Sequence, residues 1–138
     1  QLAGSTKVYD LHGSAHRNYC MKCGKRFGMD YILASRGVPR CDADGGIVRP
    51  EVVLYGEALP EDVIYQAVDA IRQADALLVV GTSLVVYPAA SFVRYFRGKH
   101  LVLINRSATS YDGCAGLVIN DDIVQVVRET EPYLQPAR

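Results

Sequence analysis

Three short apolar runs alternate with helix-like patterns in the second half of the chain, and this alternation strongly constrains the fold. The runs are "ALLVV" (76–80), "HLVLI" (100–104) and "GLVI" (116–119). Continuous apolar runs of this length are typical of strands buried on both faces, as in a parallel sheet. Helical patterns lie before, between and after them, at residues 59–75, 87–98 and 121–130. We therefore predict an α/β fold with a parallel, Rossmann-like sheet that has helices on both faces.

Small polar residues directly follow two of these strands. Gly81, Thr82 and Ser83 come after "ALLVV", and Asn105 comes after "HLVLI". In open parallel sheets, ligands gather beyond the carboxyl ends of the strands, and backbone N–H groups beside a glycine can approach a phosphate. An ordinary strand-to-helix turn and a turn asparagine would explain the same residues. These residues alone do not decide between a nucleotide site and two turns.

A group of cysteines indicates a metal site. Cys20, Cys23 and Cys41 have the spacing of zinc-ribbon ligands, and Asp44 stands where a fourth cysteine is expected. Zinc accepts carboxylate oxygen as well as thiolate sulfur. We therefore predict a zinc-ribbon-like module at residues 19–49 with Asp44 as the fourth ligand. The alternative is that Asp44 faces solvent and the three cysteines hold no metal.

His12 lies in "LHGS", at the end of a predicted strand "KVYDL" (7–11). A histidine at such a position can serve as a general base near neutral pH, and a purely structural histidine is the simpler alternative. "EVVLY" (51–55) is predicted as a further strand, closed by Gly56 and Glu57. It can pair with an extended peptide or be an ordinary internal strand.

Composition and charge exclude several classes of function. Lys+Arg and Asp+Glu are 15 each, a formal net charge of zero, which argues against a broad surface for direct nucleic-acid binding. No apolar run approaches the roughly 20 residues that span a bilayer, and no secretory signal opens the sequence. We expect a cytoplasmic protein with no membrane partner, whose cysteines bind metal or stay free. The first residue is Gln1 rather than Met, so we expect the chain to be part of a longer protein.

The order of the motifs is more specific than any single motif. "LHGSAHRNYCMKC", "GGIVRPEVVLYGE", "VVGTSLVVYPAA" and "LVLINRS" follow one another at separations that strongly resemble the sirtuin family, the NAD-dependent protein deacylases. The resemblance runs from about Gln1 to Thr130. It implies NAD, a structural zinc and an acyl-lysine protein or peptide as substrate. In the family, the acyl oxygen attacks the ribose C1′ and nicotinamide leaves. Free lysine and O-acyl-ADP-ribose are the final products.

The resemblance also assigns roles to single residues. His12 matches the catalytic base, which acts on a ribose hydroxyl of NAD. The residues that match the NAD site are Gly81, Thr82, Ser83, Asn105, Arg106, Ser107, Asp122 and Ile123. The residues that match the two segments on either side of the substrate peptide are Val53, Leu54, Tyr55, Gly56 and Glu57, and Leu84, Val85, Val86 and Tyr87. The residues that match three of the four zinc ligands are Cys20, Cys23 and Cys41.

Two features depart from the family pattern. Asp44 replaces the fourth cysteine, and the N-terminal half of the pattern, with its glycine-rich loop over the NAD phosphates, is absent. We expect residues 1–18 and 50–130 to form part of the NAD-binding fold, with a frayed tail at 131–138, and the chain alone to be inactive. Two alternatives stay open. One is a non-catalytic metal-binding interaction module, and the other is a degenerate remnant that binds nucleotide weakly.

Overall fold

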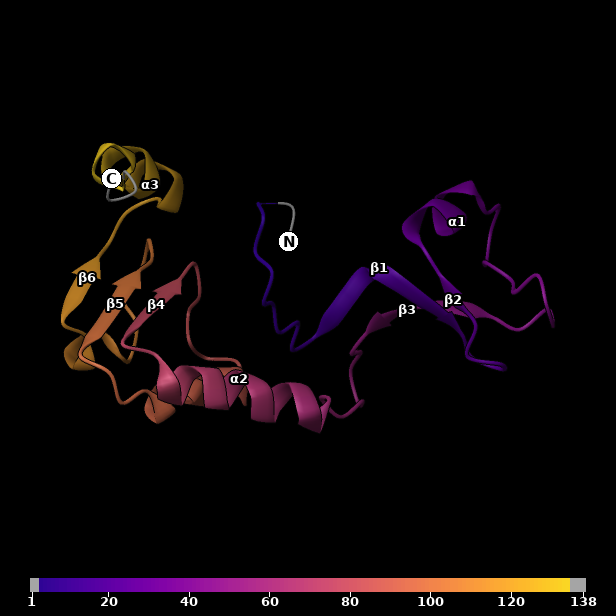
Figure 1. The fold of residues 1–138 in the computed structure, drawn as a ribbon, viewed down its shortest axis with the longest axis horizontal. Coiled ribbons are helices and arrows are strands. Elements are labelled where there is room, and N and C mark those ends of the chain that lie inside the picture. The colour runs from indigo at the N-terminus through magenta and orange to yellow at the C-terminus, as the bar shows by residue number, and fades with distance from the viewer. Residues whose placement is uncertain (1–2, 135–138) are drawn as a thin grey trace. The chain divides into compact units, whose positions relative to one another are not determined.

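The computed structural model describes residues 3–134, which form two compact units that divide after Ile64 (Figure 1). Each unit has a sheet and a hydrophobic core of its own. Within the described residues, no helix combines the length and apolar character that a bilayer span requires.

The first unit is built on a small antiparallel sheet in the order β2-β1-β3. Its elements are β1 (Gly13–Cys20), β2 (Arg26–Phe27), α1 (Met29–Ala34) and β3 (Val48–Val52). A bulge interrupts the β1–β3 ladder, because Ser14 is opposite Glu51 but Asn18 is opposite Pro50. Proline cannot donate to a ladder, and the irregular pairing lies next to it.

The core of the first unit lies beside the cysteines. Cys20, Phe27, Cys41 and Val48 are buried together, and Tyr31 of α1 packs its ring 4.4 Å from that of Phe27. Burial of this cluster holds α1 and the cysteine loops against the end of the sheet. The predicted module at residues 19–49 therefore has a core in which two of the expected metal ligands take part.

The second unit contains the parallel sheet, in the order β4-β5-β6 (Figure 1). Its elements are the C-terminal part of α2 (Glu61–Gln73), β4 (Ala76–Val80), the 3₁₀ helix η1 (Ala89–Tyr95), β5 (His100–Ile104), the 3₁₀ turn η2 (Asp112–Cys114), β6 (Leu117–Ile119), α3 (Ile123–Thr130) and the 3₁₀ turn η3 (Glu131–Tyr133). β4 and β5 match the predicted runs residue for residue, and both strand pairs are parallel. The predicted α/β fold with a parallel sheet is confirmed.

One face of this sheet carries the core. Leu101 and Leu103 of β5 are buried with Leu84, Ala90 and Tyr111, and Leu103 is only 1% exposed. On β4 the burial alternates, so that Leu77 packs against this cluster while Leu78 is 60% exposed. The expectation that β4 is buried on both faces is wrong for this structure, because its second face is open.

Several local predictions need correction. Residues 7–10 form no strand, since the carbonyl of Asp10 accepts from the N–H of Gly13 at 2.8 Å and closes a turn through His12, from which β1 starts. β3 overlaps the predicted strand at 51–55 only at Glu51 and Val52. The pattern at 87–98 forms a 3₁₀ rather than an α-helix.

The predicted tail is also partly ordered. Residues 131–133 form the η3 turn, in which the N–H of Leu134 bonds to the carbonyl of Glu131, while residues 135–138 lie outside the described part. The division of the chain into an NAD-binding part at 1–18 and 50–130 and a module at 19–49 stays a prediction.

Candidate functional site

Two similar backbone turns carry the expected metal ligands. In the first, the N–H of Gly24 bonds to the carbonyl of Cys20, and the N–H of Cys20 bonds to the carbonyl of Lys25, both at 2.9 Å. In the second, Gly45 and Gly46 make the equivalent bonds with Cys41, at 2.9 and 2.7 Å. Gly24 and Gly45 both have positive φ, 75° and 70°, which favours glycine. The turn that contains Asp44 is thus built like the turn that contains Cys23.

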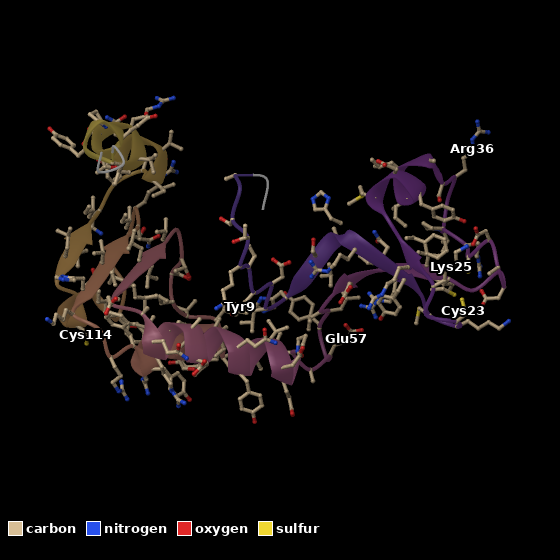
Figure 2. All side chains as sticks on the ribbon, in the orientation of Figure 1. Tyr9, Cys23, Lys25, Arg36, Glu57 and Cys114 are labelled. Carbon is tan, nitrogen blue, oxygen red and sulfur yellow. The ribbon has the colours of Figure 1, made fainter. Side chains whose placement is uncertain are left out.

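The four side chains converge. The ligand atoms of Cys20, Cys23, Cys41 and Asp44 all lie within 4.8 Å of one another. The Sγ atom of Cys20 is 3.4 Å from Oδ1 of Asp44, and the Sγ atoms of Cys23 and Cys41 are 3.7 Å apart. The remaining cysteine, Cys114, belongs to the other unit and is not in this group (Figure 2).

The electrostatics of the group favour a bound cation. Burial would raise the pKa of the Cys20 thiol, but the N–H groups of Cys23 and Lys22, which point at its sulfur, outweigh burial and hold that pKa below its usual value. The N–H of Gly46, above all, lowers the pKa of Asp44 to about 2. The N–H of Lys25 lowers the pKa of Cys23, but burial and the contacts with Asp44 and the other thiols prevail and raise it to about 11.

The pKa values of the Cys20 and Cys23 thiols are shifted in opposite directions for a simple reason. A second thiolate beside Cys20 and Asp44 is unfavourable until a cation neutralises it. Three thiolates and one carboxylate form a donor set that suits zinc. The structure therefore shows a site that can hold a zinc ion, with Asp44 in the fourth position.

The carboxyl ends of the parallel strands bring together the polar residues of the second unit. Gly81 follows β4 with φ 62°, and its N–H bonds to the carbonyl of Ile104 on β5 at 3.0 Å. The hydroxyl of Thr82 accepts from the N–H of Leu84 at 3.2 Å. Leu84 also has a positive φ, 53°, and is buried in the core of the unit. The turn after β4 is consequently held by packing as well as by hydrogen bonds.

Asn105 and Asp122 lie at the same edge of the sheet. The N–H of Asn105 bonds to the carbonyl of Ile119 at 3.1 Å, and its side-chain amide donates to the carbonyl of Ser107 at 2.8 Å. Asp122 caps α3 by accepting from the N–H of Val124 at 2.8 Å. It also pairs with Arg106. The guanidinium of Arg106, followed by the N–H of Val124, lowers the pKa of the Asp122 carboxyl.

His12 lies in the first unit, in the exposed turn that leads into β1. Its carbonyl accepts from the N–H of Val53 at 3.0 Å, so the backbone of His12 is attached to the segment 53–57. The predicted peptide segment 84–87 belongs to the other unit, where Val85, Val86 and Tyr87 are exposed. Unlike them, Leu84 is a core residue.

Comparison with known proteins identifies the family. A family model described as the Sir2 family matches residues 1–88, more than half of the chain. The chain belongs to the Sir2 family. The relatives of this Sir2 chain include proteins named NAD-dependent protein deacetylase from Clostridium acetobutylicum, 59% identical over 92% of this chain and 52% of its own length, and from Cutibacterium acnes, 51% identical over 99% and 55%. The chain thus spans about half the length of these curated relatives.

Solved structures agree with this Sir2 assignment. One described as "Sir2-p53 peptide-NAD+" matches with a TM-score of 0.82 and 39% identity, over 95% of this chain and 57% of that chain. Another is a Sir2 complex with an inhibitor, 2'-O-acetyl-ADP-ribose and a deacetylated p53 peptide, with a TM-score of 0.82 and 37% identity over 95% and 58%.

Sequence reasoning missed some residues of this Sir2 chain that support the site. A Cβ on Gly46 would lie 2.6 Å from the sulfur of Cys20, so only glycine fits between the two metal-binding turns. The side chain of Asn120 donates to the carbonyl of Asn105 at 3.2 Å. Arg49 pairs with Glu57. The two consecutive glycines after Asp44 were a signal in the sequence that could have pointed to Gly46. The Asn120–Asn105 and Arg49–Glu57 pairs leave no pattern in the sequence.

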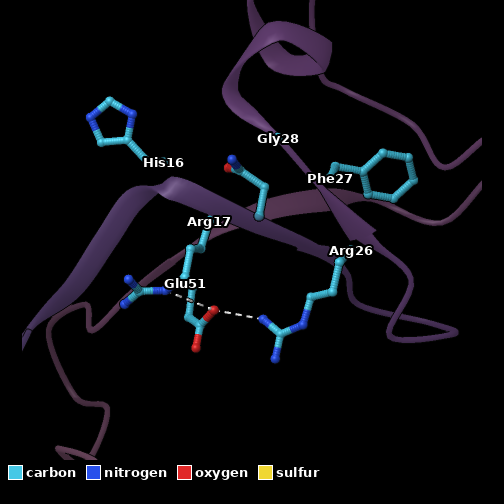
Figure 3. A pocket seen from close by; sticks show the side chains of 7 residues that line it. His16, Arg17, Arg26, Phe27, Gly28 and Glu51 are labelled. Atoms are coloured by element: carbon cyan, nitrogen blue, oxygen red, sulfur yellow. Dashed lines mark hydrogen bonds and ion pairs between the residues drawn. The ribbon is translucent and has the colours of Figure 1, made fainter. Parts of the chain in front are cut away.

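The first unit has a cavity of about 530 Å³, and none of the predicted site residues lines it (Figure 3). Exposed His16 lies at its rim, and Asn18, which is buried, donates to the carbonyl of Ala15 at 3.1 Å. Three charged residues also line the cavity, and among them Glu51 lies between Arg17 and Arg26 and pairs with both. These charges are satisfied within the unit.

Proposed function

We propose that this chain is the C-terminal part of an NAD-dependent protein-lysine deacetylase. The observation that carries the proposal is the edge of the parallel sheet, where Gly81, Asn105 and Asp122 lie at the carboxyl ends of successive strands. Membership of the Sir2 family and relatives named NAD-dependent protein deacetylase support it. About half of those relatives' length has no counterpart in this chain, and we propose that an N-terminal half completes the catalytic site.

The residues proposed to hold NAD offer suitable chemistry. The turn after β4 offers backbone N–H groups and the hydroxyls of Thr82 and Ser83 to phosphate oxygens, as glycine-containing strand ends do. Asn105, Arg106 and Ser107 offer donors and acceptors to ribose hydroxyls, and Asp122 and Ile123 would lie beside the adenine. NAD supplies an activated ribose C1′ with nicotinamide as the leaving group.

His12 is the proposed general base. Its ring is exposed, and its main chain is fixed by the turn to Gly13 and by the bond from Val53. A histidine that is neutral near pH 7 can accept a proton from a ribose hydroxyl. Its proposed role is to hold and transfer that proton while the hydroxyl attacks the acyl carbon.

The proposed partner is an acyl-lysine peptide bound as an added strand. Segments 53–57 and 84–87 would pair with it through main-chain groups, a mode that tolerates many peptide sequences. The metal residues Cys20, Cys23, Cys41 and Asp44 would hold a structural zinc at the end of β1. We also propose a cytoplasmic location, which fits four cysteines that form no disulfide in the structure.

The test is co-expression of the chain with the N-terminal half of a Sir2 protein, followed by incubation with NAD and an acetyl-lysine peptide. Mass spectrometry should detect nicotinamide, deacetylated peptide and O-acetyl-ADP-ribose. His12→Ala should lower turnover by ~10²-fold or more, whereas His16→Ala, at another exposed histidine of the same unit, should not. Near-normal turnover by the His12 variant would refute the assignment of the base. No turnover by a folded, zinc-loaded pair would favour a non-catalytic module.

A further inference from the structure

We propose that Arg49 and Glu57 form a clamp that fixes the peptide-binding loop 53–57, so that both are positioning residues and Glu57 does not contact the peptide. The word "peptide" rests on the proposed function, but the clamp itself is a feature of the first unit alone. Glu57 belongs to the segment predicted to contact substrate, and its carboxylate faces the chain's own residues instead (Figure 2).

The two side chains make a network around the loop. Nη1 and Nη2 of Arg49 donate to Oε1 and Oε2 of Glu57 at 2.6 and 3.0 Å. Nη2 also donates to the carbonyl of Val52 at 2.8 Å. Oε2 of Glu57 accepts from the N–H of Leu54 at 2.9 Å, and the N–H of Glu57 bonds to the carbonyl of Leu54 at 3.1 Å. One guanidinium and one carboxylate therefore bind both ends of the loop.

The clamp is anchored in the sheet. Arg49 is opposite Tyr19 in the β1–β3 register, and its guanidinium lies 6.0 Å from the centre of the Tyr19 ring. The Arg49 side chain is only 19% exposed. A planar, two-pronged donor matches a carboxylate in a way that a lysine ammonium cannot. Arg49 therefore links the loop to β3 and holds it in a fixed position relative to that strand.

The network determines which main-chain groups are left for a peptide. Both the N–H and the carbonyl of Leu54 are engaged with Glu57, so an added strand must pair with other groups of the loop. The Tyr55 side chain at the tip is fully exposed, at 108%. Val53 donates to the carbonyl of His12, so a loosened loop also loosens the proposed base.

The same sheet provides matched controls. Arg26 pairs with Glu51 at 2.6 Å (Figure 3). Its guanidinium lies 5.7 Å from the centre of the same Tyr19 ring. This pair has the same chemistry and the same aromatic neighbour as the clamp, but it does not touch the loop. Arg26→Gln therefore removes one ion pair of the same kind, and Glu51→Gln removes it together with the pair to Arg17, while both leave residues 53–57 in place.

The first experiment measures loop mobility without any assay of activity. The zinc-loaded chain is digested with chymotrypsin, and the rate of cleavage after Tyr55 is followed by mass spectrometry. Since cleavage of an exposed loop depends on local opening, Arg49→Gln and Glu57→Gln should each raise this rate by ~10-fold. Arg26→Gln and Glu51→Gln should change it by less than ~2-fold. Arg49→Lys should fall between the wild type and Arg49→Gln.

Equal cleavage rates in the clamp and control variants would overturn the proposal. Circular dichroism and zinc content identify any variant that has unfolded as a whole. If Arg49→Gln unfolds, the exposed Glu57→Gln still decides the question.

The second experiment uses the co-expressed, complete fold. Glu57→Gln should raise KM for the acetylated peptide by ~10-fold and leave KM for NAD within ~2-fold, because the loop is proposed to bind the peptide and none of its residues is proposed to bind NAD. A variant that lowers kcat with unchanged peptide KM would overturn the positioning role. If neither the wild type nor any variant deacetylates the peptide, but chymotrypsin still cleaves the clamp variants faster, the proposed function is wrong and the clamp is supported.

Discussion

Gly13→Ala should destabilise the first unit by an amount that the structure sets. Gly13 has φ 75°, and a Cβ on it would lie 1.8 Å from the carbonyl oxygen of Glu51 on β3. The main chain fixes the position of a Cβ, and the carbonyl is itself a main-chain group, so no side-chain rotation can relieve the overlap. β1 and β3 must separate at the point where the turn through His12 enters the sheet.

The magnitude has two parts. A left-handed conformation costs a residue with a Cβ about 1–2 kcal/mol, and losing a ladder hydrogen bond where the strands part costs about 0.5–1.5 kcal/mol. Together they lower the free energy of unfolding by about 1.5–3.5 kcal/mol. Gly37 also has φ 75°, but nothing lies within 4 Å of the position that a Cβ on it would take. Gly37→Ala should therefore show only the conformational part.

The assay is equilibrium urea unfolding of the zinc-loaded chain, with zinc release to a chromogenic chelator as the signal for the first unit. Gly28→Ala, at a glycine with negative φ and open surroundings, provides the baseline. Loss of unfolded-state freedom affects all three variants alike, so the order should be Gly13, Gly37, Gly28, from largest loss to smallest. A Gly13 variant no less stable than the Gly37 variant would refute the reasoning.

Three further predictions concern the metal, the sheet edge and the isolated chain. Protein purified without added zinc should contain about one equivalent of zinc by metal analysis. Asp44→Cys should hold the zinc more tightly against a chelator, and Asp44→Ala should release it at a rate at least ~10-fold higher. Less than a tenth of an equivalent in the wild type, with Asp44→Cys restoring one equivalent, would mean that the site is lost. Because Arg106 lowers the pKa of Asp122, the stabilising contribution of this carboxylate is complete above about pH 4 and is lost as the pH falls through its lower folded pKa. The stability of α3, followed by circular dichroism between about pH 5 and 2, should accordingly fall less steeply with pH in Asp122→Asn, and equal slopes would contradict the ion pair. The isolated chain should be inactive, should associate through the open face of β4 and should bind NAD weakly, as seen by sedimentation and calorimetry; a monomer with micromolar affinity would contradict this.

The sequence predicted the parallel sheet well, because its signal is local. "ALLVV" is apolar throughout, "HLVLI" is apolar after His100, and a glycine or an asparagine follows each run, so strand, length and edge follow from neighbouring residues. The prediction failed at "KVYDL", which was predicted to be a strand. A hydrogen bond from Gly13 to Asp10 and an ion pair from Asp10 to Arg17 make it an irregular segment and a turn. These interactions depend on the folded chain, and no local pattern marks them.

The candidate site likewise contains some residues that a local sequence pattern predicts and others that it does not. The metal ligands were predictable, since their spacing alone places two pairs in two turns. Arg49 was not, because its partner is eight positions away across a loop and the pair looks like any two charges in the sequence. The family resemblance places Glu57 in a segment beside the peptide, but it does not indicate where the carboxylate points. The direction of a charged side chain depends on the cation that the fold brings beside it.

The replacement of a cysteine by Asp44 is physically tolerable because the metal-binding turns do not depend on the ligands for their shape. In both turns the geometry comes from backbone hydrogen bonds and from a glycine at positive φ directly after the second ligand. A carboxylate in that place accepts the N–H of Gly46, as the sulfur of Cys20 accepts the N–H groups of Lys22 and Cys23. Both ligand types thus accept backbone N–H groups of the turn to which they belong. We therefore expect the exchange of sulfur for oxygen to change metal affinity more than the fold of the module.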